Sequence, residues 1–234
     1  PSAGVTIKAG GMSVEFSTAD GKAALNSLRD KGDTEWASPF SGKASLWRLA
    51  LRGPDSATAE LVGGDVPVTG VDATEHSLRL TWKAALGGGE ALVSLVIVGD
   101  KTEQLSYWSF QAGLPEGWIV DRADWPVLAN VRTQPDLKMA APFGWGLEYD
   151  VQAGMSYEGT YPSLVTSMPF VAFYGHGKGL YVGAHDKQGH HKYLAVKARE
   201  DGAGVTFTHW PAEVDTANGR YAPEFHVVVG VFDG

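Results

Sequence analysis

Hydrophobic and polar residues alternate along most of this chain with a period of two, which is the period of a β-strand. The segments 78–82 and 205–209 are clear examples, because each places its hydrophobic residues at every second position. We therefore predict that both are strands with one buried face and one solvated face. The runs 91–98 and 225–232 are apolar at nearly every position, which predicts strands that are covered on both faces.

Short turn signals separate these runs. Asp20 and Gly21 form a preferred two-residue hairpin turn, so we expect the segment 22–31 to return as a partner strand although its composition also suits a short helix. Further turn signals lie at 53–55, 63–65, 87–89, 99–100, 175–177 and 201–202. This pattern predicts an all-β, antiparallel protein with less than about a tenth of its residues in helices, against the usual third.

The stretch 115–162 departs from the alternating pattern. It contains five prolines and two Gly-Trp pairs, and it shows little alternation. We predict long loops here, and loops on a rigid scaffold often carry function. Because no linker, charge block or repeat divides the chain, we predict that residues 1–234 form a single β-sandwich domain.

Composition narrows the classes of partner. The chain has 27 acidic and 19 basic residues and a net charge of −8, which argues against a nucleic-acid partner bound through phosphates. No apolar run is long enough to span a bilayer, so we predict no membrane partner. The absence of cysteine excludes disulfides, thiolate metal sites and cysteine nucleophiles. The chain starts at Pro1, which we interpret as a processed secreted or periplasmic protein or an excised fragment, with a cytoplasmic location as the alternative.

Histidines gather beside a single aspartate near the C-terminal third. His185, Asp186 and His190 would suit a zinc-type site if a hairpin brought them together. No standard ligand spacing is present, however, and we predict neither a metal ion nor another cofactor.

Asp186 precedes a Lys-Gln-Gly turn, so we assign it a structural role. We expect its carboxylate to accept hydrogen bonds from backbone amides or from Lys192, and its removal to cost about 1 to 2 kcal/mol of stability.

The remaining acidic residues provide no recognisable catalytic pair. Most lie in turns, where carboxylates bind local backbone donors. Glu148, Asp150 and Glu158 form the single cluster in the loop-rich stretch. Neither a nucleophile elbow nor a nucleotide-binding glycine motif occurs, so we assign no catalytic residue.

Aromatic residues are the strongest remaining signal, with eight Trp, eight Tyr and nine Phe. Four tryptophans lie in alternating runs and are expected in the core: Trp36, Trp47, Trp82 and Trp108. Six aromatic residues of the loop-rich stretch are candidates for carbohydrate binding or for a domain interface: Trp118, Trp125, Trp145, Tyr149, Tyr157 and Tyr161. Trp145 lies between two glycines, so we expect its indole to project from the surface.

Several short motifs, taken in their order, resemble a known family. They lie at residues 16–36, 46–49, 143–146, 161–163, 179–186 and 228–234. Together they are similar to the N-terminal sandwich domain of a poorly characterised family of bacterial glycoside hydrolase-like proteins. The resemblance spans nearly the whole chain. It implies a galactose mutarotase-like β-supersandwich that precedes a catalytic (β/α)8 barrel.

The resemblance implies that this chain is a non-catalytic domain, which supports the barrel and binds glycan through its aromatic loops. Its expected partners are therefore a glycan and the barrel of the same protein. A second hypothesis is a stand-alone mutarotase-like enzyme with histidine acids and a glutamate base, for which His76, His176, His185 and Glu224 are available. A third is a carbohydrate-binding module.

Overall fold

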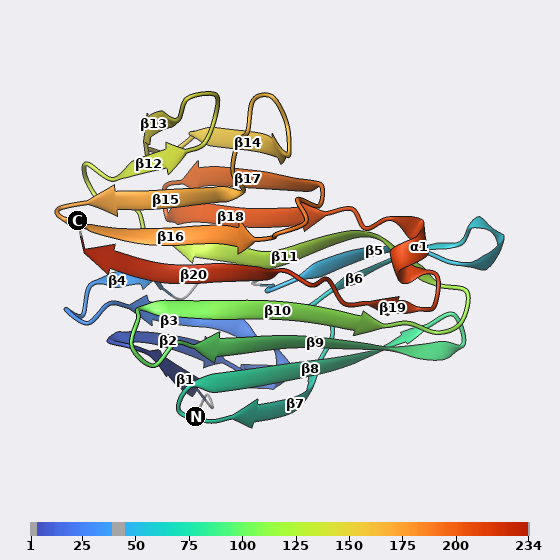
Figure 1. The fold of residues 1–234 in the computed structure, drawn as a ribbon. Coiled ribbons are helices and arrows are strands. Elements are labelled where there is room, and N and C mark those ends of the chain that lie inside the picture. Colours follow the sequence, from blue (N-terminus) through green and yellow to red (C-terminus); the bar gives the residue numbers. More distant parts are fainter. Residues whose placement is uncertain (1–3, 39–44, 234) are drawn as a thin grey trace.

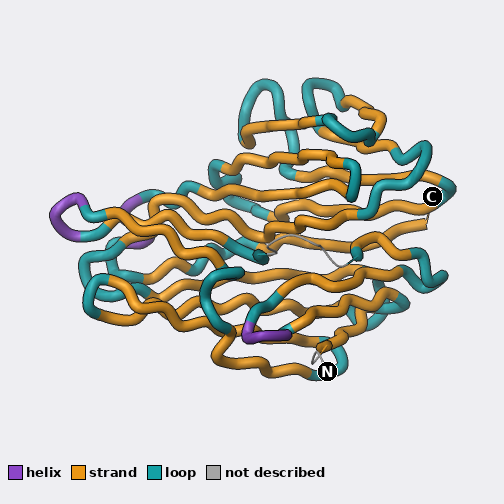
Figure 2. Tube along the Cα trace, turned by 180° about the vertical axis from the view of Figure 1, so that it is seen from behind, coloured by secondary structure: helices purple, strands orange, loops and turns teal. Residues whose placement is uncertain are grey.

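The computed structural model of this chain describes residues 4–38 and 45–233. Strands account for 61% of the structure and helices for 4%, so the predicted all-β, antiparallel class is confirmed. Two large antiparallel sheets face each other (Figures 1 and 2). None of the described residues forms a helix that is long and apolar enough to cross a membrane.

The first sheet, called sheet A below, contains most of the N-terminal strands. Its main path is β1 (Gly4–Ala9), β2 (Met12–Ser17), β3 (Ala24–Arg29), β4 (Glu35–Ala37), β11 (Ile119–Val131), β18 (Gly202–His209), β17 (Lys192–Arg199) and β14 (Ser156–Tyr161). Two further strands join it through β11: β5 (Arg48–Arg52) and its partner β6 (Thr58–Val62).

The second sheet, sheet B, forms the front face of Figure 1. Its path is β13 (Leu147–Asp150), β12 (Lys138–Ala141), β15 (Phe170–Gly175), β16 (Lys178–His185), β20 (His226–Asp233), β10 (Leu105–Gly113), β9 (Gly89–Gly99), β8 (Ser77–Leu86) and β7 (Val68–Ala73), and β19 (Arg220–Tyr221) pairs with β10. The described helices are single turns: η1 (Ala19–Gly21), η2 (Pro54–Ser56) and α1 (Glu213–Thr216).

The two apolar runs predicted to be covered on both faces have different environments. In β20, five consecutive residues from Val227 to Val231 are buried, as predicted. In β9, by contrast, burial alternates, and Leu92 and Val98 are each 46% exposed. The prediction for β9 is therefore wrong, because none of the described segments covers the side chains on its outer face.

The Asp20-Gly21 signal marks a real hairpin, but the turn is longer than predicted. Ser17 pairs with Ala24, so six residues rather than two connect β2 to β3. Asp20 and Gly21 take positive φ angles of 54° and 71°, which glycine adopts easily and aspartate tolerates. The segment 22–31 supplies strand β3, as predicted.

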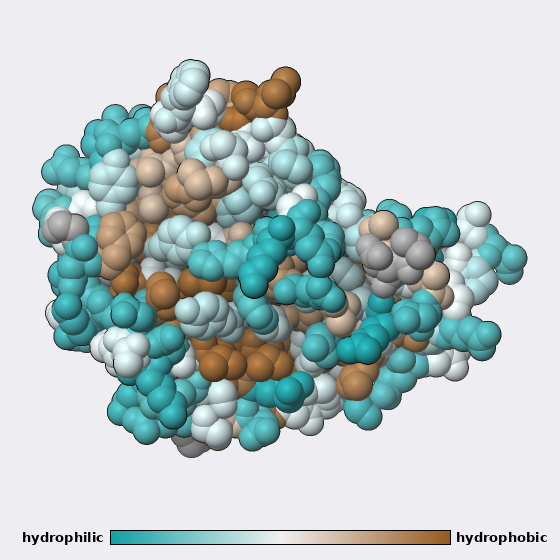
Figure 3. Space-filling model, viewed as in Figure 1, coloured by the Kyte–Doolittle hydropathy of each residue, from teal (hydrophilic) through white to brown (hydrophobic). Residues whose placement is uncertain are grey.

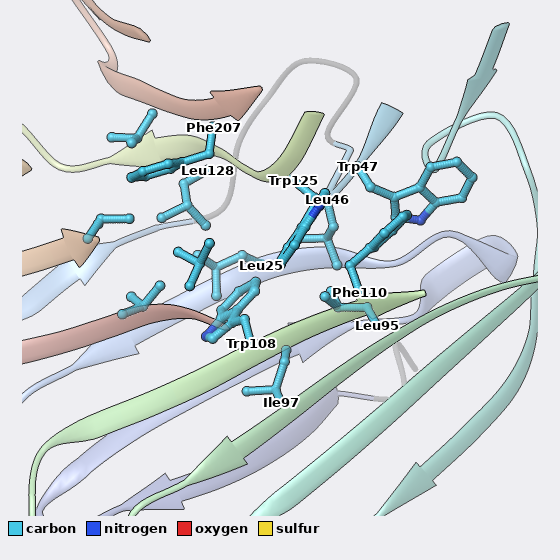
Figure 4. Close-up of a cluster of buried hydrophobic side chains, with 14 of the residues drawn as sticks. Leu25, Leu46, Trp47, Leu95, Ile97, Trp108, Phe110, Trp125, Leu128 and Phe207 are labelled. Atoms are coloured by element: carbon cyan, nitrogen blue, oxygen red, sulfur yellow. The ribbon is translucent and has the colours of Figure 1, made fainter. Parts of the chain in front are cut away.

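The core lies between the two sheets and is rich in aromatic rings (Figure 4). Phe110 of β10 stacks on Trp125 of β11, with centroids 5.6 Å apart, and also contacts Trp47 at 5.9 Å. Trp125 stacks in turn on Phe225 at 5.3 Å. All four tryptophans expected in the core are at most 1% exposed: Trp36, Trp47, Trp82 and Trp108.

The predicted long loops of 115–162 are largely absent. This stretch contains the whole of β11, β12, β13 and β14, and β11 lies in the interior of sheet A. Pro126 hid this strand from the sequence pattern, because proline cannot donate to a sheet ladder. The structure accommodates Pro126 where the register between β11 and β18 shifts, between Asp124 and Val127.

Candidate functional site

Asp186 organises the loop that joins β16 to β17. Its carboxylate accepts hydrogen bonds from the backbone amides of Gln188 at 3.0 Å and His190 at 2.7 Å. It also pairs with the Nζ of Lys192 and with the Nδ1 of His190. The contacts predicted for Asp186 are therefore present, and both carboxylate oxygens are engaged in the turn.

The Asp186–Lys192 pair is buried, with side chains only 2% and 1% exposed. Burial alone would raise the pKa of Asp186, but the hydrogen bonds from Lys192, Gln188 and His190 outweigh it and lower the pKa to about 2. Lys192 also lies over the ring of Phe225, with Nζ 4.1 Å from the centroid. The buried Asp186–Lys192 pair therefore anchors this loop to the core.

A second buried network lies next to this pair. The Nε1–H of Trp125 donates to the Oη of Tyr221 at 3.0 Å, and that hydroxyl contacts the Nδ1 of His209 at 2.7 Å. Burial, followed by the charges of Lys192 and His190, lowers the pKa of His209 to about 3. His209 is therefore a neutral imidazole at ordinary pH.

Two adjoining pockets are lined in part by residues of these networks. The first, called the His185 pocket, has a volume of about 360 Å³ and is lined by Tyr107, His185, Gln188, Glu224 and His226, among others. The second, called the His209 pocket, has a volume of about 250 Å³. Gln188 and Glu224 line both pockets, and the Nε2 of Gln188 donates to Glu224 at 2.9 Å.

Sheet pairing brings two histidines together in the His185 pocket. His185 ends β16 and His226 begins β20, and the two are directly paired across these strands. The Nε2 of His185 lies 3.2 Å from the hydroxyl of Tyr181, and the Nδ1 of His226 lies 2.8 Å from that of Ser109. Burial, followed by the charge of His226, lowers the pKa of His185. With Glu224, these groups can exchange hydrogen bonds with hydroxyl groups of a ligand.

Of the six aromatic residues assigned to a binding surface, three are buried, and this part of the prediction is wrong. Trp118 is 7%, Trp125 is 1% and Tyr157 is 3% exposed. Trp125 points into the core from β11, and Tyr157 contacts Tyr149, with ring centroids 5.8 Å apart. Tyr149 and Tyr161 are half-buried. Trp125 and Tyr157 lie in strands rather than loops and face inward, and Trp118, just before β11, packs against Gly53 and Gly87.

Trp145 does project, and it is fully exposed. Gly144 and Gly146 on either side have φ angles of 59° and 96°, and nothing lies within 4 Å of the place that a Cβ would take at either position. The amide of Gly144 donates to the carbonyl of Val165 at 2.5 Å, which joins the Trp145 loop to the loop that follows β14.

These two loops carry a cluster of exposed apolar side chains, called the apolar patch below. Its members are 38% exposed or more: Phe143, Trp145, Leu147, Leu164, Val165 and Met168. Figure 3 shows hydrophobic surface at the top of the molecule, over the loop that follows β14. A groove of about 590 Å³ runs through the patch.

Sequence reasoning missed His209, Tyr221 and His226. The alternation over 205–209 placed His209 on the same face as two buried apolar residues, which was a usable signal for a buried, hydrogen-bonded histidine. Nothing in the sequence indicated that Tyr221 would meet it, because the contact depends on how β19 lies against the core.

The amino-acid sequence of the chain is similar to parts of two longer proteins. No protein-family model matches the chain. The chain is 28% identical over 169 residues to a "Putative glycoside hydrolase" of Bacteroides thetaiotaomicron, an alignment that covers 69% of this chain and 24% of that protein. It is 27% identical over 162 residues to a "Putative glycoside hydrolase" of Monosiga brevicollis, covering 66% of this chain and 13% of that protein.

Three solved structures share the arrangement of strands. An α-N-acetylgalactosaminidase from Bifidobacterium bifidum superposes with a TM-score of 0.70 at 13% identity, over 98% of this chain and 36% of that chain. A GH36 α-galactosidase from Geobacillus stearothermophilus gives 0.65 at 12% identity, over 98% and 40%. A "Putative aldose 1-epimerase" from Escherichia coli gives 0.61 at 11% identity, over the whole of both chains. The chain has the galactose mutarotase-like fold.

The galactose mutarotase-like fold confirms the resemblance inferred from the sequence. The chain spans about a quarter or less of the two curated relatives and 36% and 40% of the two glycosidase structures.

Within this fold, the residues considered for a mutarotase are only partly brought together. His185 and Glu224 line the same pocket. His76 lies in the turn between β7 and β8, where its Nδ1 is 2.9 Å from the carbonyl oxygen of Lys8, and His176 lies in the turn between β15 and β16. In the part of the chain that the structure describes, no three His, Asp or Glu side chains are grouped as metal ligands.

Proposed function

We propose that this chain is the accessory β-supersandwich domain of a longer glycoside hydrolase-like protein, and that the apolar patch docks it on the catalytic domain. The observation that carries the proposal is the patch itself. Trp145 and Leu164 are both fully exposed, and two hydrogen-bonded loops hold them on one surface. Contiguous exposed apolar side chains of this kind mark interaction surfaces.

The composition of the patch favours a protein partner over a sugar. A sugar ring stacks on aromatic faces and needs polar groups around them. Here Trp145 is accompanied by the aliphatic side chains of Leu164, Val165 and Met168, which suit the apolar centre of a domain interface. The length of the relatives supports the same reading, because each has ample chain for a further domain. Glycan binding at the patch is the competing outcome.

Mixing the chain with the separately produced catalytic segment of its parent protein would test this proposal. We expect a complex by calorimetry, and a loss of at least about 2 kcal/mol of binding free energy in Trp145→Ala, the range of an interface anchor. The matched control is Leu92→Ser on β9, which removes an exposed apolar side chain outside the patch. Equal binding by both variants and the parent chain would contradict docking through the patch.

A second candidate function is epimerisation of free sugars. The observation that favours it is the His185 pocket, where a carboxylate and two imidazoles line one hollow. These are the residue types that can move a proton between a sugar hydroxyl and the ring oxygen. Optical rotation of freshly dissolved α-glucose or α-galactose would test it, with Glu224→Gln as the inactive control. A rate equal to the spontaneous rate would exclude this function for these two sugars.

A further inference from the structure

A groove of about 600 Å³ lies on the outer face of sheet A and is called the sheet A groove below. Small side chains of three neighbouring strands form its floor: Ala129 of β11, Gly204 and Thr206 of β18, and Ala195 of β17. Longer side chains of β5, β11, β14 and β17 form its sides. Because β18 lies between β11 and β17, the groove runs along β18.

Basic side chains outnumber acidic ones along this groove. The cations are Arg48, Arg122, Lys197 and Arg199, and the carboxylates are Asp124 and Glu158. The whole chain carries a net charge of −8, so this excess of positive charge is a local feature of the groove. A groove lined mainly by one sign of charge attracts ligands of the opposite sign.

Two of these cations form exposed ion pairs that a ligand can replace. Lys197 lies 3.9 Å from Glu158, with side chains 67% and 50% exposed. Arg48 lies 3.3 Å from Glu60, with side chains 48% and 53% exposed. Exposed pairs of this kind contribute at most about 1 kcal/mol, so a ligand carboxylate can take the place of the resident one.

Arg122 makes only long contacts with its two carboxylate neighbours. Its Nε lies 3.5 Å from Asp124 and its Nη2 lies 4.0 Å from Glu60. The Nε–H is buried and makes no hydrogen bond among the described residues. The Asp124 oxygen already accepts a hydrogen bond from the hydroxyl of Thr208 at 2.7 Å. A guanidinium group binds a carboxylate best through two parallel hydrogen bonds, so the exposed end of Arg122 can hold a ligand carboxylate.

The spacing of the groove residues matches that of an extended polypeptide. Lys197 and Arg199 lie two residues apart on β17, and side chains on one face of a strand repeat every second residue, at about 6.6 Å. An extended peptide along β18 has the same repeat, so acidic residues at alternate positions would meet successive cations. At the other end of the groove, Trp210 is 39% exposed and offers apolar surface to a neighbouring side chain.

We propose that the sheet A groove binds an extended segment of a partner protein that carries acidic residues at alternate positions. Arg122 holds one carboxylate near Trp210, and Lys197 and Arg199 hold others at the opposite end. This site goes beyond the docking proposed for the apolar patch, because the two grooves share no lining residue.

Fluorescence anisotropy of the whole chain with labelled synthetic peptides would test the proposal. The probe is a short peptide in which Glu and Thr alternate, and the control peptide has the same composition with all Glu residues in one block. We expect saturable binding of the alternating peptide, which weakens as salt is added, and weaker binding of the block peptide. Equal binding of the two peptides, or binding of neither, would overturn the proposal. Binding of oligogalacturonate but not of the alternating peptide would overturn the assignment to a protein segment.

Variants of exposed residues connect binding to the groove. We expect Lys197→Gln to weaken binding of the alternating peptide about fivefold, the upper range for an exposed charge pair. The matched control is Lys83→Gln on β8 of sheet B, because Lys83 is also an exposed strand lysine, 3.2 Å from Glu90. Equal losses in the two variants would show unspecific attraction by charge and overturn the site.

Two further variants separate this site from its alternatives. Glu158→Gln should strengthen binding of the alternating peptide, because it removes the carboxylate that competes for Lys197. Weaker binding by Glu158→Gln would contradict the role of the groove cations. Trp145→Ala should bind the peptide as the parent chain does, so the docking proposal and this one can fail separately.

Discussion

Lys192 is an ammonium group in the interior, and among the described residues its carboxylate partner is Asp186. Moving both charges out of water is costly, and their mutual attraction with the surrounding hydrogen bonds repays that cost only while both are present. The loss of stability expected on removing Asp186 is therefore larger in the structure than the sequence alone suggests. A capping aspartate is worth about 1 to 2 kcal/mol, but a partner of a buried charge is worth more.

We predict that Asp186→Ala lowers the free energy of unfolding by about 3 to 5 kcal/mol, because it leaves Lys192 buried without a counter-charge. Urea unfolding followed by tryptophan fluorescence would measure the change. The double variant Asp186→Ala with Lys192→Met should recover part of the loss, since the isolated charge is gone. A double variant less stable than Asp186→Ala alone would contradict this explanation.

Stability should also depend on His209 in acid. The pKa of His209 is lowered from 6.5 to about 3, so the folded state prefers the neutral ring. Its contribution is complete above pH 6.5 and is lost as the pH falls from 6.5 towards 3, by up to about 1.4 kcal/mol per pH unit, because only the unfolded state takes up the proton there.

Unfolding free energies of His209→Asn and the parent chain, measured from pH 7 to pH 4, would check this slope. We expect the variant to be less stable at pH 7 and less sensitive to acid. His176→Asn, in the exposed turn between β15 and β16, is the control and should keep the parent slope. Asp186, with its pKa lowered from 3.8 to about 2, adds a separate loss only as the pH falls below about 4. If the unfolding free energy of His209→Asn fell with pH as steeply as that of the parent chain, groups other than His209 would cause the acid sensitivity.

At the scale of elements, β20 packs closely against the start of β10 at Gly230. A Cβ at Gly230 would lie 2.3 Å from a side-chain atom of Leu105 and 2.7 Å from the backbone oxygen of Gln104. The side chain can move, but the backbone oxygen belongs to the loop before β10, which pairs with β20. The strand therefore needs glycine at this position for packing reasons.

We predict that Gly230→Ala lowers the free energy of unfolding by about 1 to 3 kcal/mol, the usual cost of overpacking. Gly113→Ala on β10 is the control, since the nearest atom to its Cβ would be 3.9 Å away. Thermal unfolding of the two variants would compare them directly. Similar losses in both would point to backbone effects of alanine rather than to the crowding at β20.

At the scale of the whole molecule, the position of a tryptophan between or outside the two sheets decides whether it stabilises the core. Trp125 is sandwiched between Phe110 and Phe225, whereas Trp145 has no cover. We predict that Trp125→Ala costs about 3 to 5 kcal/mol and that Trp145→Ala leaves the unfolding temperature of the chain unchanged. Differential scanning calorimetry would measure both. A clear destabilisation by Trp145→Ala would mean that the patch is part of the core.

The sequence by itself determined the class of fold and the position of many strands. Period-two alternation is a local property, so the buried face of β8 and the inward position of His209 on β18 can be predicted from a few neighbouring residues. The same holds for the exposure of Trp145, where two flanking glycines leave the indole without neighbours. Such predictions need no knowledge of which strands pair.

Only the tertiary structure decided which residues meet. The contact of Trp125 with Tyr221 joins residues that are 96 positions apart, and Glu224 reaches Gln188 across 36. Sheet pairing sets these contacts, and hairpin turns constrain only neighbouring strands. Trp118, Trp125 and Tyr157 were misassigned for this reason, because whether an aromatic ring is a binding surface or core depends on what the opposite sheet places against it.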